Sequence, residues 1–119
     1  MSDEFISLAT KEINEEISEI ETILNSCKND DDVNQNSTQL QKHTHKIKGL
    51  APMMGKAELG SFAAILDSIL KKMIDGITIN GIFNDMRDSI SSINQYMSEP
   101  NYDLAEIRNR ISQILNNLN

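Results

Sequence analysis

The sequence predicts an all-α protein of five helices, arranged as an antiparallel up-down four-helix bundle with one additional helix. Its 119 residues are 39% hydrophobic but only 4% aromatic. The apolar residues recur every three or four positions, which is the period of an amphipathic helix. No segment alternates with the period of a strand, and short connections between helices favour antiparallel neighbours. A chain of this length is expected to form a single domain over residues 1–119.

The first helix is predicted over residues 3–28. Ser2 or Asp3 is expected to cap its beginning, because short polar side chains accept hydrogen bonds from the free N–H groups of a first turn. Several glutamates crowd its outer surface, and we interpret them as a solvated face. The apolar seam of this helix consists of Ile6, Ala9, Ile13, Ile17, Ile20, Leu24 and Cys27.

The second helix is predicted over about residues 33–54, after a polar stretch that interrupts the apolar period. Asp31 or Asp32 is expected to cap it. The consecutive aspartates lack the spacing of an EF-hand, so no metal site is predicted. Pro52 has no N–H for the preceding turn, and we expect a tolerated bend near the helix end. Gly55 is expected to close the helix, since glycine is common just past a helix end.

Three further helices are predicted over about residues 56–75, 79–97 and 103–118. Thr78 or Asn80 is expected to cap the fourth helix. Asp103, with Glu106 three residues later, forms a capping-box-like pair at the start of the last one. The expected buried residues of these helices are Leu59, Phe62, Ala63, Leu66, Ile69, Leu70 and Met73, then Ile79, Phe83, Met86, Ile90, Ile93 and Met97, then Leu104, Ile107, Ile111, Ile114, Leu115 and Leu118.

Charge and cysteine content narrow the classes of function. The net charge is −7, and the 11 Lys and Arg residues form no basic stripe. Nucleic-acid binding is therefore not expected, because phosphate neutralisation is its main source of affinity, and the same charge disfavours an anionic membrane. Cys27 is the single cysteine and is interpreted as a small buried residue. With no signal peptide and no apolar run near 18 residues, the sequence predicts a cytoplasmic protein without membrane insertion.

The chain is organised around residues 43–55 of the second predicted helix. At about 100° per residue, one side of this segment is apolar and must face a core. His45 falls on the opposite side, with Gly49 one turn beyond it and Lys48 beside that line. Glycine costs about 1 kcal/mol in a helix relative to alanine. A glycine here would let another protein approach the imidazole closely.

His45, Lys48, Gly49 and Gly55 follow the pattern H-x-x-K-G-x-x-x-x-x-G. This pattern resembles the signature of histidine phosphotransfer (HPt) domains. The segment from residue 66 to 79 is also similar to the N-terminal phosphotransfer domain of CheA chemotaxis kinases, in which an acidic residue follows the histidine at the same interval. The resemblance covers the whole chain in layout and residues 45–79 in detail.

The resemblance implies that His45 is the phosphoacceptor, that Asp67 orients its imidazole and that Lys48 stabilises the phosphate. These residue types suit the chemistry. Neutral imidazole is a nucleophile near pH 7, a carboxylate can fix its tautomer, and an ammonium group can hold a phosphoryl oxygen. Two positions depart from the family pattern. Asp67 stands where the family more often has Glu, so its contact with the imidazole is expected to be long or bridged by water, and Ala64 stands where CheA relatives often have a second histidine.

Four residues around His45 are predicted to form the surface for docking and close approach of partners: Lys46, Gly49, Pro52 and Gly55. Lys46 is equally well explained as a solvated lysine. His43 leans toward the apolar stripe and is interpreted as a partly buried structural residue. The two imidazoles point roughly 160° apart on a helix, so they do not form a metal pair.

The sequence therefore predicts a histidine phosphotransfer domain of two-component signalling that acts in chemotaxis. It would accept phosphate on His45 from an ATP-binding, CheA-type histidine kinase domain, in cis or in trans, and pass it to an Asp of a response-regulator receiver. The domain would be a monomeric module without cofactors and not a self-sufficient enzyme, because no Gly-rich phosphate loop is present. The alternatives are an HPt module of a multistep phosphorelay and a helical docking module that is not phosphorylated. A metal-binding four-helix protein is not supported, because neither histidine has a Glu three residues before it.

Overall fold

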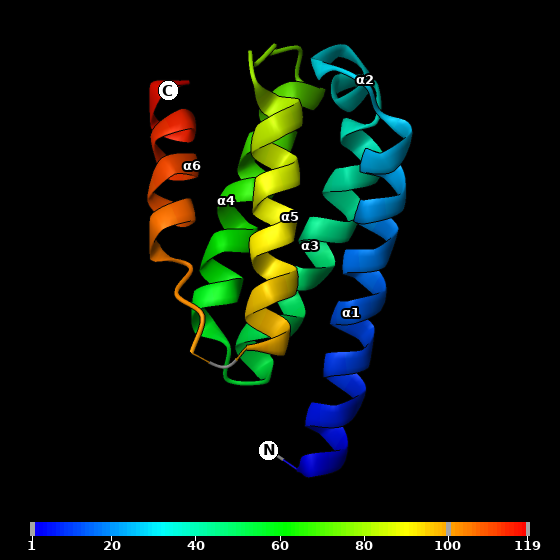
Figure 1. Ribbon diagram of the computed structural model, residues 1–119, viewed down its shortest axis with the longest axis vertical. Helices are drawn as coiled ribbons and strands as arrows, with labels where there is room; N and C mark the ends of the chain where they lie inside the picture. Colours follow the sequence, from blue (N-terminus) through cyan, green and yellow to red (C-terminus); the bar gives the residue numbers. More distant parts are fainter. Residues whose placement is uncertain (1, 100, 119) are drawn as a thin grey trace.

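The apolar seams of the sequence fold into six helices in the computed structural model, which describes residues 2–99 and 101–118. No strand occurs within those residues, so the prediction of an all-α protein is confirmed. The helices are drawn in Figure 1 and run as follows: α1 (Asp3–Ser26), α2 (Asp30–Gln35), α3 (Ser37–Met53), α4 (Ala57–Ile74), α5 (Ile82–Ser98) and α6 (Ala105–Asn117).

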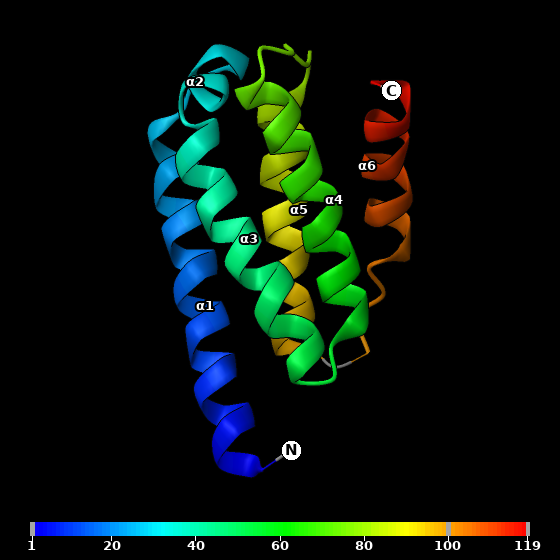
Figure 2. The same cartoon turned by 180° about the vertical axis from the view of Figure 1, so that it is seen from behind.

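The four long helices α1, α3, α4 and α5 run alternately up and down (Figures 1 and 2). The contact between α3 and α4 is the most extensive, and α1 packs against both α3 and α5. The last helix, α6, packs on α4 and α5. The first turns of α1 extend beyond the other helices at the end of the molecule where the chain begins. None of the helices in the described ranges combines the length with the apolar character that a membrane crossing requires.

The core is aliphatic, as the composition indicates. Phe62 is its one large aromatic side chain with no exposure, and Cys27 is buried as predicted. The expected seam of α4 is buried throughout, whereas Ile6, Phe83 and Met97 lie at the edge of the core. Other fully buried large side chains include Ile13, Ile17, Ile20, Leu40, Ile47, Leu59, Leu66, Ile69, Leu70, Ile82 and Met86.

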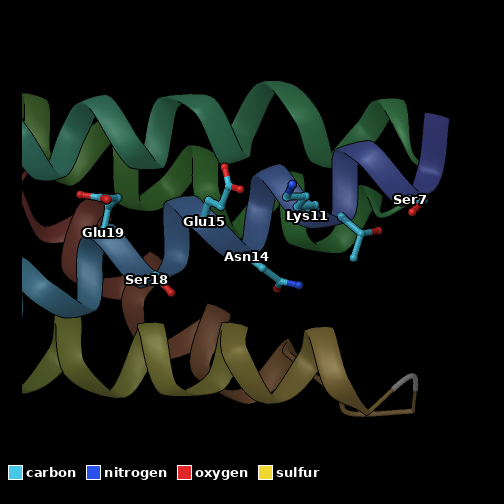
Figure 3. A pocket seen from close by; sticks show the side chains of 7 residues that line it. Ser7, Lys11, Asn14, Glu15, Ser18 and Glu19 are labelled. Atoms are coloured by element: carbon cyan, nitrogen blue, oxygen red, sulfur yellow. The ribbon is translucent and has the colours of Figure 1, made fainter. Parts of the chain in front are cut away.

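The outer face of α1 is polar and exposed, as its glutamates indicate. A shallow hollow on this face is lined by side chains of α1 alone (Figure 3), among them Lys11, Glu15 and Glu19. Glu16 is the exception to the predicted solvated face, because it is buried with 7% of its surface exposed. The start of the helix agrees with the sequence, since Oγ of Ser2 accepts a hydrogen bond of 3.1 Å from the N–H of Phe5.

The second predicted helix, 33–54, is two helices in the structure. They meet at Asn36, whose backbone (φ −100°, ψ 11°) leaves the helical conformation. The prediction that Asp31 or Asp32 is the cap is wrong: Oδ1 of Asn29 caps α2 by accepting a hydrogen bond of 2.9 Å from the N–H of Asp32. The polar stretch that was expected to be partly loop therefore forms a short helix, α2, because the residue that caps it is Asn29.

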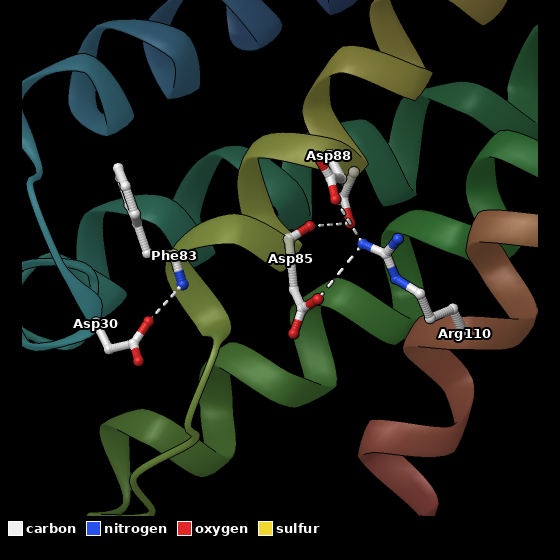
Figure 4. A network of polar contacts seen from close by, with 6 residues as sticks. Asp30, Phe83, Asp85, Asp88 and Arg110 are labelled. Atoms are coloured by element: carbon white, nitrogen blue, oxygen red, sulfur yellow. Dashed lines mark hydrogen bonds and ion pairs between the residues drawn. The ribbon is translucent and has the colours of Figure 1, made fainter.

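Asp30 caps a helix that is distant in sequence. Its carboxylate accepts hydrogen bonds of 2.9 Å from the N–H groups of Gly81 and Phe83, at the start of α5. Figure 4 shows the bond from Phe83. These two bonds lower the pKa of Asp30 below its usual value, and the bond from Phe83 has the larger effect. The prediction that Thr78 or Asn80 caps this helix is therefore wrong, and α5 begins at Ile82 rather than near residue 79.

The helices α3 and α4 each end at a glycine. Gly55 has φ +80°, its N–H donates to the carbonyl of Pro52, and the N–H of Lys56 donates to the carbonyl of Ala51. This pair of bonds is the Schellman motif, which satisfies the last carbonyl groups of a helix. The prediction that Gly55 closes the helix is confirmed, and Gly76 (φ +107°) closes α4 in the same way.

The last helix begins at Ala105, two residues later than predicted. The residue at the N-cap position is Leu104, so the prediction that Asp103 is the cap is wrong. Oδ1 of Asp103 instead accepts a hydrogen bond of 2.8 Å from the N–H of Ala105. Arg110 connects α6 to α5 through Asp88, at 2.9 Å, and Asp85, at 3.4 Å (Figure 4). Burial raises the pKa of Asp85, although Arg110 acts in the opposite direction.

Candidate functional site

The helix α3 presents His45 on the side that faces away from the core. The side chain of His45 is 61% exposed. The neighbouring residues Thr44, Ile47 and Ala51 are buried and hold this helix against the rest of the molecule. The sequence period thus places the imidazole at the surface, as predicted, while its helix is anchored by the opposite face.

Asp67 of α4 lies beside His45, and its side chain is only 1% exposed. Oδ1 of Asp67 is 3.8 Å from Nδ1 of His45. This separation suits an ion pair but exceeds the length of a direct hydrogen bond. The expectation of a long contact agrees with the distance, and the role of Asp67 in orienting the imidazole stays a prediction.

Three other side chains form hydrogen bonds or ion pairs with the carboxylate of Asp67. Nε2 of Gln41 donates a hydrogen bond of 2.7 Å to Oδ1. Nζ of Lys71 lies 3.2 Å from Oδ2, and Nζ of Lys48 lies 3.7 Å from the same oxygen. Lys71 follows Asp67 by one turn of α4, a spacing that allows such a pair, whereas the contact of Gln41 is not among the sequence predictions. Gln41 lies one turn before His45 on the same helix, which is the spacing that could have indicated it.

The charges at this site leave a positive excess. One buried carboxylate faces the ammonium groups of Lys48 and Lys71, which are 42% and 55% exposed. Because both lysines can extend into solvent, they can also meet an anion that arrives at His45. The residue types and their separations therefore suit an anionic group bonded to the imidazole.

Gly49 leaves the backbone bare one turn after His45. A Cβ added there would meet no atom within 4 Å, so the space above this turn is open. Pro52 lies further along and its ring packs on α4: a Cβ added at Gly60 would lie 2.7 Å from Cγ of Pro52. Pro52 remains within α3, which continues to Met53, and the expected tolerance of proline near the helix end is confirmed. Gly55 lies in the turn that follows.

His43 and Lys46 point to a different element, α1. Nδ1 of His43 lies 2.5 Å from Oε2 of Glu16, and Nζ of Lys46 lies 3.2 Å from Oε1 of the same carboxylate. The side chain of His43 is 16% exposed, which confirms its partial burial. The side chain of Lys46 is exposed, but its ammonium group forms an ion pair across to α1.

The described residues hold no group of three or more His, Cys, Asp or Glu that could bind a metal ion. Cys27 is buried, and this burial, together with the negative charge of Asp32, raises the pKa of its thiol. A raised thiol pKa disfavours the thiolate, which is the nucleophilic form of cysteine.

No protein-family model matches the chain, and neither the curated proteins nor the solved structures contain a match to it. The candidate function therefore depends on the geometry around His45 and on the sequence motif. The structure brings His45, Lys48, Gly49 and Asp67 to one face of α3 and α4. It turns Lys46 toward α1 instead.

Proposed function

We propose that the chain is a histidine phosphotransfer domain of two-component signalling, of the type found in CheA chemotaxis kinases. In this proposal α1, α3, α4 and α5 are the antiparallel four-helix bundle of an HPt-like fold and α6 is its additional helix. The observation that carries it is an exposed imidazole beside a buried carboxylate that also contacts two lysines. The open backbone at Gly49 adds room for a partner at this point.

The imidazole of His45 is the phosphoacceptor. Its Nδ1 faces Asp67, which leaves Nε2 as the nucleophile. The lone pair of Nε2 attacks the γ-phosphorus of ATP held by a kinase domain, and the bond from phosphorus to the ADP oxygen breaks. Nδ1 keeps its proton during this step, so the ring becomes positively charged. The carboxylate of Asp67 stabilises that charge, as an aspartate does for a catalytic histidine.

Lys48 holds an oxygen of the phosphoryl group, because an ammonium group forms strong hydrogen bonds with phosphate. The response-regulator receiver then approaches over Gly49, with Pro52, Gly55 and Lys46 at the margin of its contact. The phosphoryl group moves to an Asp of the receiver, and His45 returns to its neutral form. The domain acts in this proposal as a cytoplasmic, monomeric carrier whose ATP site belongs to the kinase domain.

Radiolabelled ATP and a CheA-type kinase core that lacks its own phosphotransfer domain test this proposal. The chain contains two histidines, so His45→Gln is compared with wild type and with His43→Gln as the matched control. The label should be acid-labile and alkali-stable, and only His45→Gln should lose it. Circular dichroism of each variant verifies that the helices remain folded.

The receiver that takes the label distinguishes the two signalling contexts. Transfer to a chemotaxis receiver supports the CheA type, and transfer only to receivers of multistep phosphorelays supports an HPt module of that kind. If no kinase core labels the folded wild-type protein, and a partner still binds His45→Gln, the chain is a docking module in which His45 has no chemical role.

A further inference from the structure

Lys71 and Gln41 contact Asp67 but have no part in the phosphotransfer step described above. Lys71 is nearer to the carboxylate than Lys48 is, at 3.2 Å against 3.7 Å, and both ammonium groups contact Oδ2. Gln41 donates to the other oxygen. A single carboxylate needs one cation to balance its charge, so the second lysine leaves one positive charge in excess.

The negative charge of a phosphoryl group on His45 would balance this excess positive charge. A phosphoryl group brings about −1.5 to −2 charges near neutral pH. Before phosphorylation, the charges of the Asp67, Lys48 and Lys71 side chains sum to +1 beside the imidazole. Afterwards the same site would be negative if only Lys48 faced the phosphate. Two lysines bring the sum close to balance, since the phosphorylated ring also carries a proton on Nδ1.

We propose that Lys71 is a second phosphate-holding residue, which moves with Lys48 from Asp67 to the phosphoryl group on His45. This inference rests on the proposed function and extends it to a residue that the sequence motif does not include. Lys71 is 55% exposed, so its side chain can turn outward without opening the core. Lys71 and His45 lie beside the two oxygens of one carboxylate, at 3.2 Å and 3.8 Å, so both side chains start next to Asp67.

Gln41 keeps Asp67 in place while the lysines move. A buried carboxylate without hydrogen bonds is strongly unfavourable. The amide of Gln41 is uncharged and has no reason to leave Asp67 for the phosphate. Its bond of 2.7 Å to Oδ1 therefore remains when Oδ2 loses its cations, and the protonated Nδ1 of His45 then faces the same carboxylate.

Phosphoramidate, a small phosphate donor, tests the proposal without a kinase. Nε2 of His45 attacks its phosphorus, the phosphorus–nitrogen bond of the donor breaks, and ammonia leaves. Urea unfolding is then measured for the phosphorylated and unphosphorylated forms of wild type, Lys71→Met and Lys71→Arg. Lys72→Met is the matched control, because it removes the same charge from the adjacent residue of α4.

The phosphorylated form of Lys71→Met should be destabilised more than its unphosphorylated form. The difference should correspond to a change of up to about fivefold in the unfolding equilibrium, which is the range of an exposed ion pair. Lys71→Arg should behave as wild type, and Lys72→Met should affect both forms equally. Phosphorylated Lys71→Met should also hydrolyse faster after the donor is removed.

Two results would overturn the inference in distinguishable ways. If Lys71→Met is phosphorylated on His45 but both of its forms lose the same stability, Lys71 only supports Asp67 and the proposed function stands. If phosphoramidate labels wild type and His45→Gln equally, or labels neither, His45 is not the acceptor and both proposals fail.

Discussion

The glycines inside α3 and α4 should respond to alanine in opposite directions. Gly49 lies on the exposed surface, and an added Cβ would meet no atom within 4 Å. Gly60 is buried, and an added Cβ would lie 2.7 Å from Cγ and 2.9 Å from Cδ of Pro52. The same substitution therefore tests open space at one site and close helix contact at the other.

The magnitudes follow from two known effects. Alanine is favoured over glycine in a helix by about 1 kcal/mol, so Gly49→Ala should raise the free energy of unfolding by about 0.5–1 kcal/mol. Gly60→Ala gains the same helix propensity, but the ring of Pro52 is fixed to the backbone and cannot rotate away from the added methyl group. Overpacking of this kind costs about 1–3 kcal/mol, which leaves Gly60→Ala less stable than wild type by roughly 1 kcal/mol.

Urea unfolding at 25 °C measures both variants. The double variant Pro52→Ala/Gly60→Ala should recover the stability that Gly60→Ala loses, because the contacting ring is gone. If Gly60→Ala is as stable as Gly49→Ala, the close approach of Pro52 to α4 does not limit the packing. Such a result would refute the reasoning about how α3 and α4 fit together.

Gly49→Ala also separates stability from function. Under the proposed function, its methyl group stands where a partner approaches His45. The variant should accept phosphate from phosphoramidate as wild type does, yet transfer it to a receiver more slowly. An unchanged transfer rate would show that the bare backbone at this turn has no role in docking.

Two further variants test contacts between distant segments. Asp30→Ala should lower the free energy of unfolding by about 1–2 kcal/mol at pH 7, since the start of α5 loses its cap. Because hydrogen bonds lower the pKa of Asp30, its contribution is complete above about pH 4 and is lost as the pH falls through the folded-state pKa. A stability gap between the two proteins that persists in strong acid would contradict this. Glu16→Ala should cost about 1–3 kcal/mol in urea unfolding, because it leaves His43 without its partner, whereas Glu15→Ala should cost little. Under the proposed function, phosphorylation of His45 should be unaffected, and its loss in folded Glu16→Ala would show that His43 is more than structural.

The helices could be predicted because their apolar periodicity is local. Each buried seam repeats every three or four residues, and the glycines that end α3 and α4 lie just past those seams. Caps from another part of the chain could not be predicted in this way. Asp30 serves α5 across 51 residues to Gly81, and no rule about neighbouring residues indicates such a pair. The sequence places Glu16 among the solvated glutamates of the first helix, because its partner His43 lies 27 residues away.

The residues of the candidate site also differ in whether local sequence or contacts between helices place them. Helical periodicity alone places His45 and Lys48 on the exposed side of one helix. The proximity of Asp67 came from the resemblance to phosphotransfer domains, since nothing within α3 indicates which residue of α4 lies opposite. Gln41 lies one turn before His45, but this spacing alone does not single it out, because a polar amide fits any exposed helix position. Its importance depends on the buried carboxylate, which only the packing of α3 against α4 reveals.

The hydrogen bonds and ion pairs of Asp67 explain why the side chain of His45 remains exposed. A carboxylate that is 1% exposed must receive hydrogen bonds or cations from its neighbours. Gln41 takes the oxygen nearest the imidazole, and two lysines take the other. If these donors were absent, the imidazole would be drawn inward to serve the carboxylate and would lose exposure. With them, His45 stays 3.8 Å from Asp67 and remains at the surface, as the proposed transfer of a phosphoryl group to its ring requires.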